Sequence, residues 1–188
     1  MKEEEKIKGL INKAKNGDSH AFAKVYEQYF TPIYRFIFFK VGNREEAEDL
    51  TQMVFLKALK SLDGFHFRDK PFSSWLYRIA NNIVIDFFRK KKSLPMLDND
   101  PDDWQIEFID QALNPAEEAE EMELAHLARQ AITKMKEPDR QILVMHYIEG
   151  LSYRDIAEII DKNEAAVRQI SSRSIQTLKS FFKDKGLL

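Results

Sequence analysis

The sequence predicts an all-α protein built from two small helical domains. Apolar residues recur at helical spacing along most of the chain, and suitable caps, prolines and glycines punctuate these stretches. No stretch of useful length alternates polar and apolar side chains as a β-strand would. The 188 residues are 44% hydrophobic and 32% charged, which is typical of a soluble, helix-rich protein with room for one large or two small domains.

Three helices are expected before residue 63. Asp18 and Asn43 are suitable N-caps, because their side-chain oxygens can accept hydrogen bonds from a first turn, and Glu46 completes a capping-box pattern with Asn43. Pro32 should separate the first two helices, since proline is tolerated in a first turn and breaks a helix interior. Gly42 should end the second helix. The expected ranges are 18–29, 32–42 and 43–62.

The third of these helices carries an apolar stripe that should pack into a core. A short loop from Asp63 to Phe72 is unusually aromatic, and a long helix should follow from about Ser73 to Lys92, ending in a basic run. The stripe expected to be buried consists of Ala47, Leu50, Val54, Ala58 and Leu59, widened by Phe55 and Leu62.

The middle of the chain differs from both ends. Residues 93–114 contain two prolines, five aspartates and no regular period, which indicates a linker between domains at 1–92 and 115–188. From Ser93 to Ala128 there are eleven Asp and Glu and no Lys or Arg. The charge balance is +6 before this stretch and +3 after it, so two mildly basic ends flank an acidic middle.

The second domain should contain four helices. Asn114-Pro115 is a good helix start, because an N-cap is followed by proline at the first helical position and by acids near the positive end of the helix dipole. Pro138, Gly150 and Lys162-Asn163 should separate the helices that follow. The expected ranges are 115–135, 138–148, 152–161 and 164–183.

Composition argues against several kinds of site. The chain has no cysteine, and its four histidines lack the spacing of metal ligands, so neither a disulfide nor a metal site is expected. No nucleotide-binding loop or nucleophile–base motif is present, so we expect no catalytic residue, cofactor or small-molecule substrate. No segment is apolar enough to insert in a membrane and the polar N-terminus is unlike a secretory signal, so a cytoplasmic protein is expected.

Residues 152–178 have the pattern of a helix-turn-helix. Ser152 and Asp155 form a capping box, and the small Ala157 stands where two helices would cross closely. Asp161 occupies the turn position where glycine is usual. Arg and Gln side chains of the second helix can bond base edges in the major groove, and Ser and Lys can reach bases or phosphates. The candidate DNA-reading residues are Arg168, Gln169, Ser172, Arg173, Gln176 and Lys179.

A helical hairpin with a solvated polar face would give the same local pattern. Because the second helix carries few cations, this domain should bind DNA weakly by itself. It fits better as one of two DNA-binding domains that are joined by a linker and act together.

Three motifs, in order along the chain, resemble the extracytoplasmic-function (ECF) class of the sigma-70 family. They read AEDLTQMVFLKAL at 47–59, FSSWLYRIANNIVIDFFRKKK at 72–92, and LSYRDIAEII…AAVRQISSRSIQTL at 151–178. The resemblance runs from about Asp18 to Phe182, with only the acidic middle unmatched. It implies a promoter-recognition subunit of bacterial RNA polymerase that binds promoter DNA and catalyses no reaction itself.

The resemblance implies two contacts with the core polymerase. The first motif would dock on a coiled coil of the largest subunit, and the polymerase flap region would be a further partner. Acidic and amide side chains suit pairing with Arg and Lys on a coiled coil, although a solvated acidic face would look the same in an isolated helix. The residues expected to dock are Glu45, Glu48, Asp49, Gln52 and Phe55.

The aromatic loop and the long helix correspond to the family's element for opening and holding the −10 promoter region. Amides can read a splayed base, cations can follow phosphates and aromatic rings can stack on bases. Phe65, Phe72 and Trp75 are also open to interpretation as core residues. Asp86 would repel phosphate, so it should orient a neighbour or accept from a cytosine. The expected −10 residues are Phe67, Arg68, Lys70, Trp75, Arg78, Asn81, Asn82, Asp86 and Arg89.

The second helix of the helix-turn-helix corresponds to the family's −35 reader. The resemblance also implies an inhibitory anti-sigma factor that clamps between the domains. Two alternatives remain open. A stand-alone helix-turn-helix regulator would leave the motifs at 44–92 unexplained. A sigma-like decoy that sequesters an inhibitor could lose Arg168, Arg173 and the basic run at 89–92, all of which this chain keeps.

Overall fold

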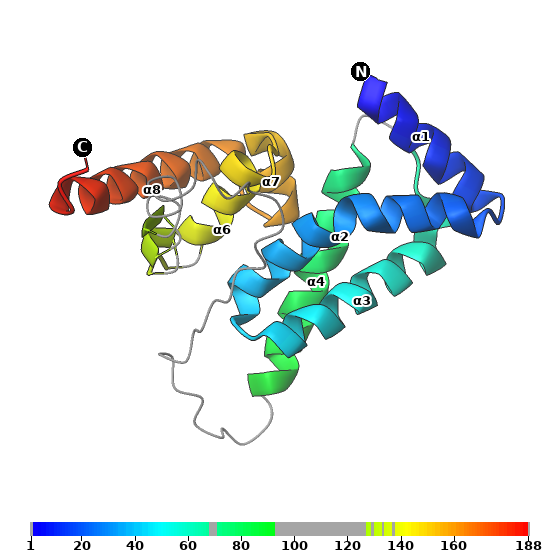
Figure 1. The fold of residues 1–188 in the computed structure, drawn as a ribbon, viewed down its shortest axis with the longest axis horizontal. Coiled ribbons are helices and arrows are strands. Elements are labelled where there is room, and N and C mark those ends of the chain that lie inside the picture. The colour runs from blue at the N-terminus through cyan, green and yellow to red at the C-terminus, as the bar shows by residue number, and fades with distance from the viewer. Residues whose placement is uncertain are drawn as a thin grey trace, which may run out of the picture.

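The computed structural model describes residues 2–67, 71–92 and 127–187, apart from residues 129, 133 and 137. Within these ranges the regular structure is helical throughout, which confirms the predicted all-α class. Figure 1 shows two groups of helices, and the linker predicted at 93–114 lies outside the described residues. The elements are α1 (Lys2–Lys15), α2 (Ser19–Val41), α3 (Arg44–Ser61), the 3₁₀ turn η1 (Leu62–Gly64), α4 (Phe72–Lys92), α6 (Asp139–Leu143), the π-helical turn η2 (Val144–Ile148), α7 (Tyr153–Ile159) and α8 (Glu164–Asp184).

Helix α2 corrects the predicted break at Pro32. It runs without interruption for 23 residues with the proline in its interior. Val25 before the proline and Ile33 and Phe36 after it are all buried in one core, and this continuous apolar contact offsets the hydrogen bond that proline cannot donate. Both predicted ends are confirmed. The Asp18 carboxylate accepts from the backbone N–H of Ala21, and Gly42 ends the helix with φ of 71°.

Helix α1 was not predicted from the sequence. It packs against α2, and its residues Ile7 and Ile11 are buried with Leu10 and Ala14 partly buried beside them. These four residues follow the i, i+3, i+4, i+7 spacing of an amphipathic helix, so the signal was present in a segment that is otherwise strongly charged. Lys15 donates to the backbone carbonyl of Phe65 and so ties α1 to the aromatic loop.

Helices α3 and α4 complete the first domain. As predicted, Asn43 caps α3, its side-chain oxygen accepting from the N–H of Glu46 at 2.9 Å. The predicted stripe of α3 is buried except at Leu59, which is 48% exposed, so that part of the prediction is wrong. Lys91 near the end of α4 donates to Glu46 at 2.9 Å and links the two helices at the surface.

The second domain has the predicted helix-turn-helix. Ser152 and Asn163 cap α7 and α8, because each side chain accepts from the N–H three residues later. Asp161, between the helices, has φ of 55°, the left-handed conformation that glycine adopts most easily. Helix α8 packs on α6 as well as on α7. Ile142, Met145, Ile156 and Val167 are buried in the core.

The two groups of helices contact each other directly. Helix α7 packs on α4, and α6 approaches α2, as Figure 1 shows near the middle of the molecule. Arg35 of α2 donates to the carboxylate of Glu149 at 2.8 Å. Asn81 of α4 donates to the backbone carbonyl of Ile159 in α7 at 2.9 Å. Helix α4, which was predicted to read DNA, therefore forms part of the contact between the two domains.

Candidate nucleic-acid interface

Helix α3 presents a polar surface along its first half. Glu45, Asp49 and Gln52 are exposed, and Glu48 is partly exposed beside them. Arg44 pairs with Glu48 at 3.0 Å, which neutralises part of the acidic charge on the helix itself. The four predicted docking residues of this polar set therefore lie at the surface, where a cationic partner can reach them.

Phe55 was expected both in the buried stripe and among the docking residues, and the structure confirms the first expectation and contradicts the second. It is only 4% exposed, and its ring lies 4.7 Å from the ring of Tyr26 in α2. A residue buried between two helices of its own domain cannot contact a docked partner. The physical reason is its position on the helix: Phe55 follows Thr51 by one turn, and Thr51 is fully buried.

Three exposed apolar residues of α3 were missed. Met53, Leu56 and Leu59 are 50%, 59% and 48% exposed. Leu56 follows Gln52 by one helical turn, so the acidic surface of the first half continues as an apolar surface in the second half. The available signal was this spacing, which places Leu56 on the side of Gln52 and away from Val54 and Ala58. We call the surface made by Glu45, Glu48, Asp49, Gln52, Met53, Leu56 and Leu59 the α3 surface.

The aromatic loop is mainly a cluster of packed rings. Phe65 and Phe72 are buried with ring centroids 5.3 Å apart, which agrees with the core interpretation of these two residues. Phe67 and Trp75 are partly exposed and pack on Phe65 at 4.8 and 4.9 Å. Arg68 and Lys70 lie outside the described residues. Phe67 and Trp75 therefore remain partly accessible while they pack on the buried ring of Phe65.

A pocket of about 270 Å³ lies beside this cluster and is shared by both domains. Phe65, Trp75 and Arg78 line it from the first domain, and Glu158 and Ile159 of α7 line it from the second. The predicted −10 residues Trp75 and Arg78 thus face α7 in this arrangement.

The polar stripe predicted on α4 lies largely at the helix surface, and its DNA-binding role stays a prediction. Arg78, Asn82 and Arg89 are exposed on the helix surface. Asp86 pairs with Arg89 at 3.0 Å, which matches the expectation that this carboxylate orients a neighbour instead of contacting phosphate. The side chain of Arg89 remains 77% exposed.

Asn81 is placed differently from the rest of this set. It is 6% exposed, and both ends of its amide are occupied. The oxygen accepts from Lys40 at 2.8 Å, and the nitrogen donates to Ile159 in the second domain at 2.9 Å. Asn81 can therefore contact DNA only when α7 moves away from α4.

A second polar contact joins the domains in a buried environment. The side chain of Glu149 is 6% exposed, and its carboxylate pairs with Arg35. Burial raises the pKa of Glu149 above its usual value, and the nearby Arg35 opposes this shift only in part. Burial, and then the charge of Glu149, also raise the pKa of Tyr77 far above its usual range. Removing Glu149 and Tyr77 from water therefore costs free energy, which the surrounding apolar contacts must offset.

Helix α8 exposes the predicted recognition residues. Gln169, Ser172 and Gln176 recur at three- and four-residue spacing and share one exposed side, opposite the buried Val167 and Ser174. Arg168 and Lys179 lie along one edge of this side, and Arg173 lies along the other edge. The centre of the surface is neutral, and cations flank it.

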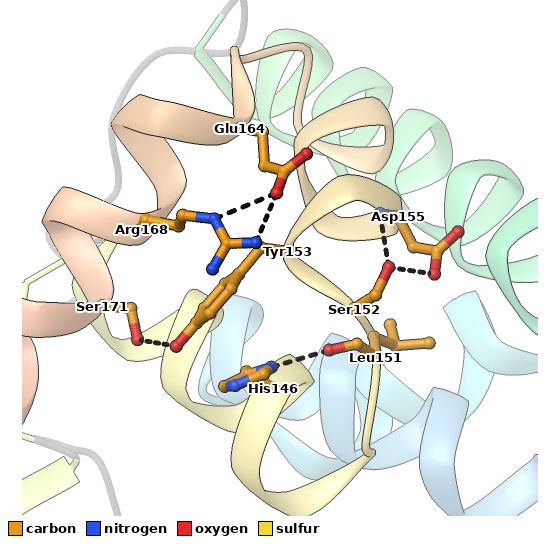
Figure 2. A network of polar contacts seen from close by, with 8 residues as sticks. All are labelled: His146, Leu151, Ser152, Tyr153, Asp155, Glu164, Arg168 and Ser171. Carbon is orange, nitrogen blue, oxygen red and sulfur yellow. Dashed lines mark hydrogen bonds and ion pairs between the residues drawn. The ribbon is translucent and has the colours of Figure 1, made fainter.

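Both arginines of α8 are held by acidic side chains. Arg168 donates through Nε and Nη2 to Glu164 and lies over the ring of Tyr153, as Figure 2 shows. Arg173 donates through Nε and Nη2 to Asp139 at the start of α6, at 3.1 and 2.8 Å. Arg173 thus joins α8 to α6 within the domain, a role that its sequence position did not reveal.

Other types of site find little support in the described part of the chain. Among these residues there is no group of three or more His, Asp or Glu arranged to hold a metal ion. None of the helices in the described ranges has the length and apolar composition needed to cross a bilayer.

Comparison with known proteins gives two family matches in the same order as the motifs. Residues 25–94 match the model of Sigma-70 region 2, and residues 125–178 match the model of Sigma-70 region 4. The chain is 33% identical to the ECF RNA polymerase sigma factor SigW of Bacillus subtilis over 183 residues, covering 95% of this chain and 97% of SigW. It is 28% identical over 186 residues to the ECF RNA polymerase sigma factor BldN of Streptomyces coelicolor, covering 93% of this chain and 65% of BldN.

A solved structure shares the fold. It contains the sigma factor RpoE in complex with the anti-sigma factor NepR from Bartonella quintana. The TM-score is 0.63 at 18% identity, and the alignment covers 86% of this chain and 96% of that chain.

Proposed function

The chain belongs to the extracytoplasmic-function sigma factors of RNA polymerase, within the sigma-70 family, and we propose how its helices divide the work of promoter recognition. The first domain, residues 1–92, binds the core polymerase and the −10 region. The second, residues 115–188, reads the −35 region. The observation that carries this proposal is that one chain combines an exposed docking helix with two separate polar surfaces suited to DNA, on α4 and on α8.

The α3 surface is the proposed polymerase contact. Glu45, Asp49 and Gln52 offer acceptors to Arg and Lys of a coiled coil, and Leu56 offers apolar area beside them. Burial of exposed leucine and methionine side chains contributes about 25 cal/mol per Å² of apolar area removed from water. The acidic half should increase the rate of association and set the orientation, and the apolar half should slow dissociation.

The α4 surface is the proposed −10 contact. Asn82 can hydrogen-bond the edge of a splayed base, Arg78 and Arg89 can follow phosphates, and Phe67 and Trp75 can stack on bases from their packed positions. Stacking supplies on the order of 1–3 kcal/mol per base, and opening DNA costs roughly 1.4 kcal/mol per step. A few captured bases therefore nucleate an opening that the polymerase must extend.

The exposed side of α8 is the proposed −35 contact. Gln169, Ser172 and Gln176 form its centre, with Arg168, Arg173 and Lys179 at its edges. The same proposal includes a cytoplasmic location, the absence of catalytic activity, contact with the polymerase flap and control by an anti-sigma factor. Family membership supports these points, and a solved protein of this fold was captured with an anti-sigma factor.

The test is run-off transcription from genomic fragments with purified chain and core polymerase. We expect new start sites that the core enzyme does not use alone. Asn82→Ala should impair DNA opening more than closed-complex formation, and Gln169→Ala should weaken closed-complex formation by about 1–3 kcal/mol if it reads a base. Lys24→Ala, at an exposed position of α2 outside these surfaces, is the control. Failure to direct core enzyme to any start site, with inhibitors absent, would overturn the proposal.

A further inference from the structure

Tyr153 is held more firmly than an ordinary surface tyrosine. Its ring stacks on His146 with centroids 3.9 Å apart and 27° between the planes. Its hydroxyl lies 3.1 Å from the hydroxyl of Ser171 in α8. His146 is itself fixed, because Nδ1 donates to the carbonyl of Leu151 at 2.8 Å. Figure 2 shows these contacts together, and they connect the tyrosine ring to His146 and to α8 of the helix-turn-helix.

Arg168 lies on this ring. Its Cζ atom is 4.8 Å from the ring centroid, and Nε and Nη2 donate to the same oxygen of Glu164 at 3.0 and 2.6 Å. In Figure 2 the tyrosine ring lies between Arg168 and His146. An exposed arginine normally samples many rotamers, and ordering it on binding costs free energy. Here the stack and the ion pair have already restricted the side chain before DNA arrives.

The remaining donors of Arg168 have a defined direction. Guanidinium carries five N–H groups, and Glu164 uses the side edge formed by Nε and Nη2. The end edge, formed by Nη1 and Nη2, still carries two parallel N–H groups that Glu164 does not use. Because the side chain is 60% exposed, we expect a ligand to reach them.

Two parallel donors match one base in the major groove. Guanine presents two acceptors there, O6 and N7, and arginine binds them together. Adenine presents one acceptor and one donor at the same positions, so one N–H of the arginine would face another donor. The end edge of a fixed Arg168 should therefore discriminate strongly between these two purines.

We propose that Tyr153, together with Glu164, is a positioning residue that holds Arg168 so that its end edge reads a guanine of the −35 region. Tyr153 itself does not touch DNA in this assignment. The inference rests on the proposed function, since it needs α8 to lie in the major groove. It goes further by naming the base, the reading edge and the two residues that aim it.

The experiment measures initiation by the chain with core polymerase on a promoter identified by run-off transcription. Each G·C pair of the −35 region is replaced in turn by A·T, and the loss at each position is recorded as a discrimination ratio. The parent chain should lose roughly five- to a hundredfold at one guanine, and Arg168→Ala should lose that discrimination. Tyr153→Phe keeps the ring and should keep the ratio. Tyr153→Leu removes the stack and should reduce the ratio toward that of Arg168→Ala.

Glu164→Ala provides a second variant at a surface position, where folding is not at risk. It should reduce the ratio at the same guanine while strengthening binding to all sequences, because a negative charge near the phosphates is removed. A purely structural role of Glu164 would not produce these opposite changes.

The outcomes separate the two proposals. If the parent chain directs initiation and both Tyr153→Leu and Glu164→Ala keep the full discrimination ratio, the positioning role is wrong and the proposed function stands. If Arg168→Ala keeps the ratio, Arg168 does not read the base. If the parent chain directs no initiation at all, the proposed function fails and this inference falls with it.

Discussion

At the scale of single residues, the turn of the helix-turn-helix places an aspartate in a backbone conformation that favours glycine. Asp161 has φ of 55°, and it is the one non-glycine residue with positive φ among those the structure describes. For an L-amino acid this conformation costs roughly 1–2 kcal/mol, although aspartate tolerates it better than most residues. The chain therefore keeps a mildly strained residue next to its proposed DNA-reading helix.

Asp161→Gly should stabilise the protein by up to about 1 kcal/mol, because glycine adopts positive φ without strain and this gain exceeds its extra entropy in the unfolded chain. The measurement is the melting temperature of the full chain. Lys162→Gly is the matched control at the neighbouring position, whose φ is not positive. There glycine relieves no strain and should lower the melting temperature. A lower melting temperature for Asp161→Gly as well would show that the aspartate makes a compensating interaction in the turn.

At the scale of elements, one side of α3 is buried in the core and the other side carries the proposed polymerase contact. Phe55 and Leu56 are adjacent apolar residues, but helical spacing places them on different sides of α3. The structure buries Phe55 against Tyr26 and leaves Leu56 59% exposed. One side chain should therefore contribute to the free energy of folding and the other to association with the polymerase.

Phe55→Ala should cost about 3–5 kcal/mol of folding free energy, since it leaves a cavity in the core. Leu56→Ala should change stability by less than about 0.5 kcal/mol and should weaken binding to core polymerase by about 1 kcal/mol or more. Denaturant unfolding and a core-polymerase binding assay measure the two effects. Unchanged polymerase binding by Leu56→Ala would remove the apolar half of the α3 surface from the proposed contact.

At the scale of the whole molecule, α7 of the second domain covers part of the α4 surface proposed to bind DNA. Asn81 is bonded to Ile159, and α7 lines the pocket beside Trp75 and Arg78. A −10 contact made through Asn81 would therefore require the domains to separate. For that contact, the free energy of separation would reduce the affinity for DNA, because only the separated population could make it.

Asn81→Asp should shift the chain toward separated domains. The substitution replaces the donor to Ile159 with a carboxylate oxygen that faces a carbonyl oxygen, while the attraction to Lys40 is kept. Loss of a buried hydrogen bond of this kind is worth about 1–3 kcal/mol. The radius of gyration from small-angle scattering should increase. Asn82→Asp, at the exposed neighbouring position, should leave it unchanged, and equal behaviour of the two variants would contradict a specific role for the Asn81 contact.

The contact between the domains should also respond to pH through Glu149. Its pKa is raised in the packed arrangement, so the packed arrangement binds the proton more tightly than the separated one. The free energy of separation is then highest below the ordinary glutamate pKa and falls as pH rises toward the raised value. Energy transfer between dyes on the two domains should increase from neutral to mildly acidic pH.

Glu149→Gln should remove this part of the pH response, because glutamine does not titrate. The difference between the parent and Glu149→Gln isolates the contribution of the glutamate. Glu27→Gln, at an exposed position of α2, is the control and should keep the parent response. An unchanged pH response in Glu149→Gln would show that another group controls the contact.

Local features were predictable with good accuracy. The caps at Asp18, Asn43 and Ser152 lie where the sequence placed them, and α8 begins and ends within one residue of its predicted range. Each of these features depends on residues a few positions apart, whose interactions form within one helical turn. The break expected at Pro32 was wrong because packing along the whole of α2 outweighs the local preference of proline.

The helical class, the caps, the helix-turn-helix and the residue types that suit DNA could all be predicted, since they follow from neighbours along the chain. Packing between distant elements was needed to show that Leu59 is exposed, that Arg173 is tied to Asp139, and that Asn81 is covered by α7. Asn81 and Ile159 are 78 positions apart, and Arg35 and Glu149 are 114 apart. Contacts over such separations arise from the packing of whole helices, which no local pattern specifies.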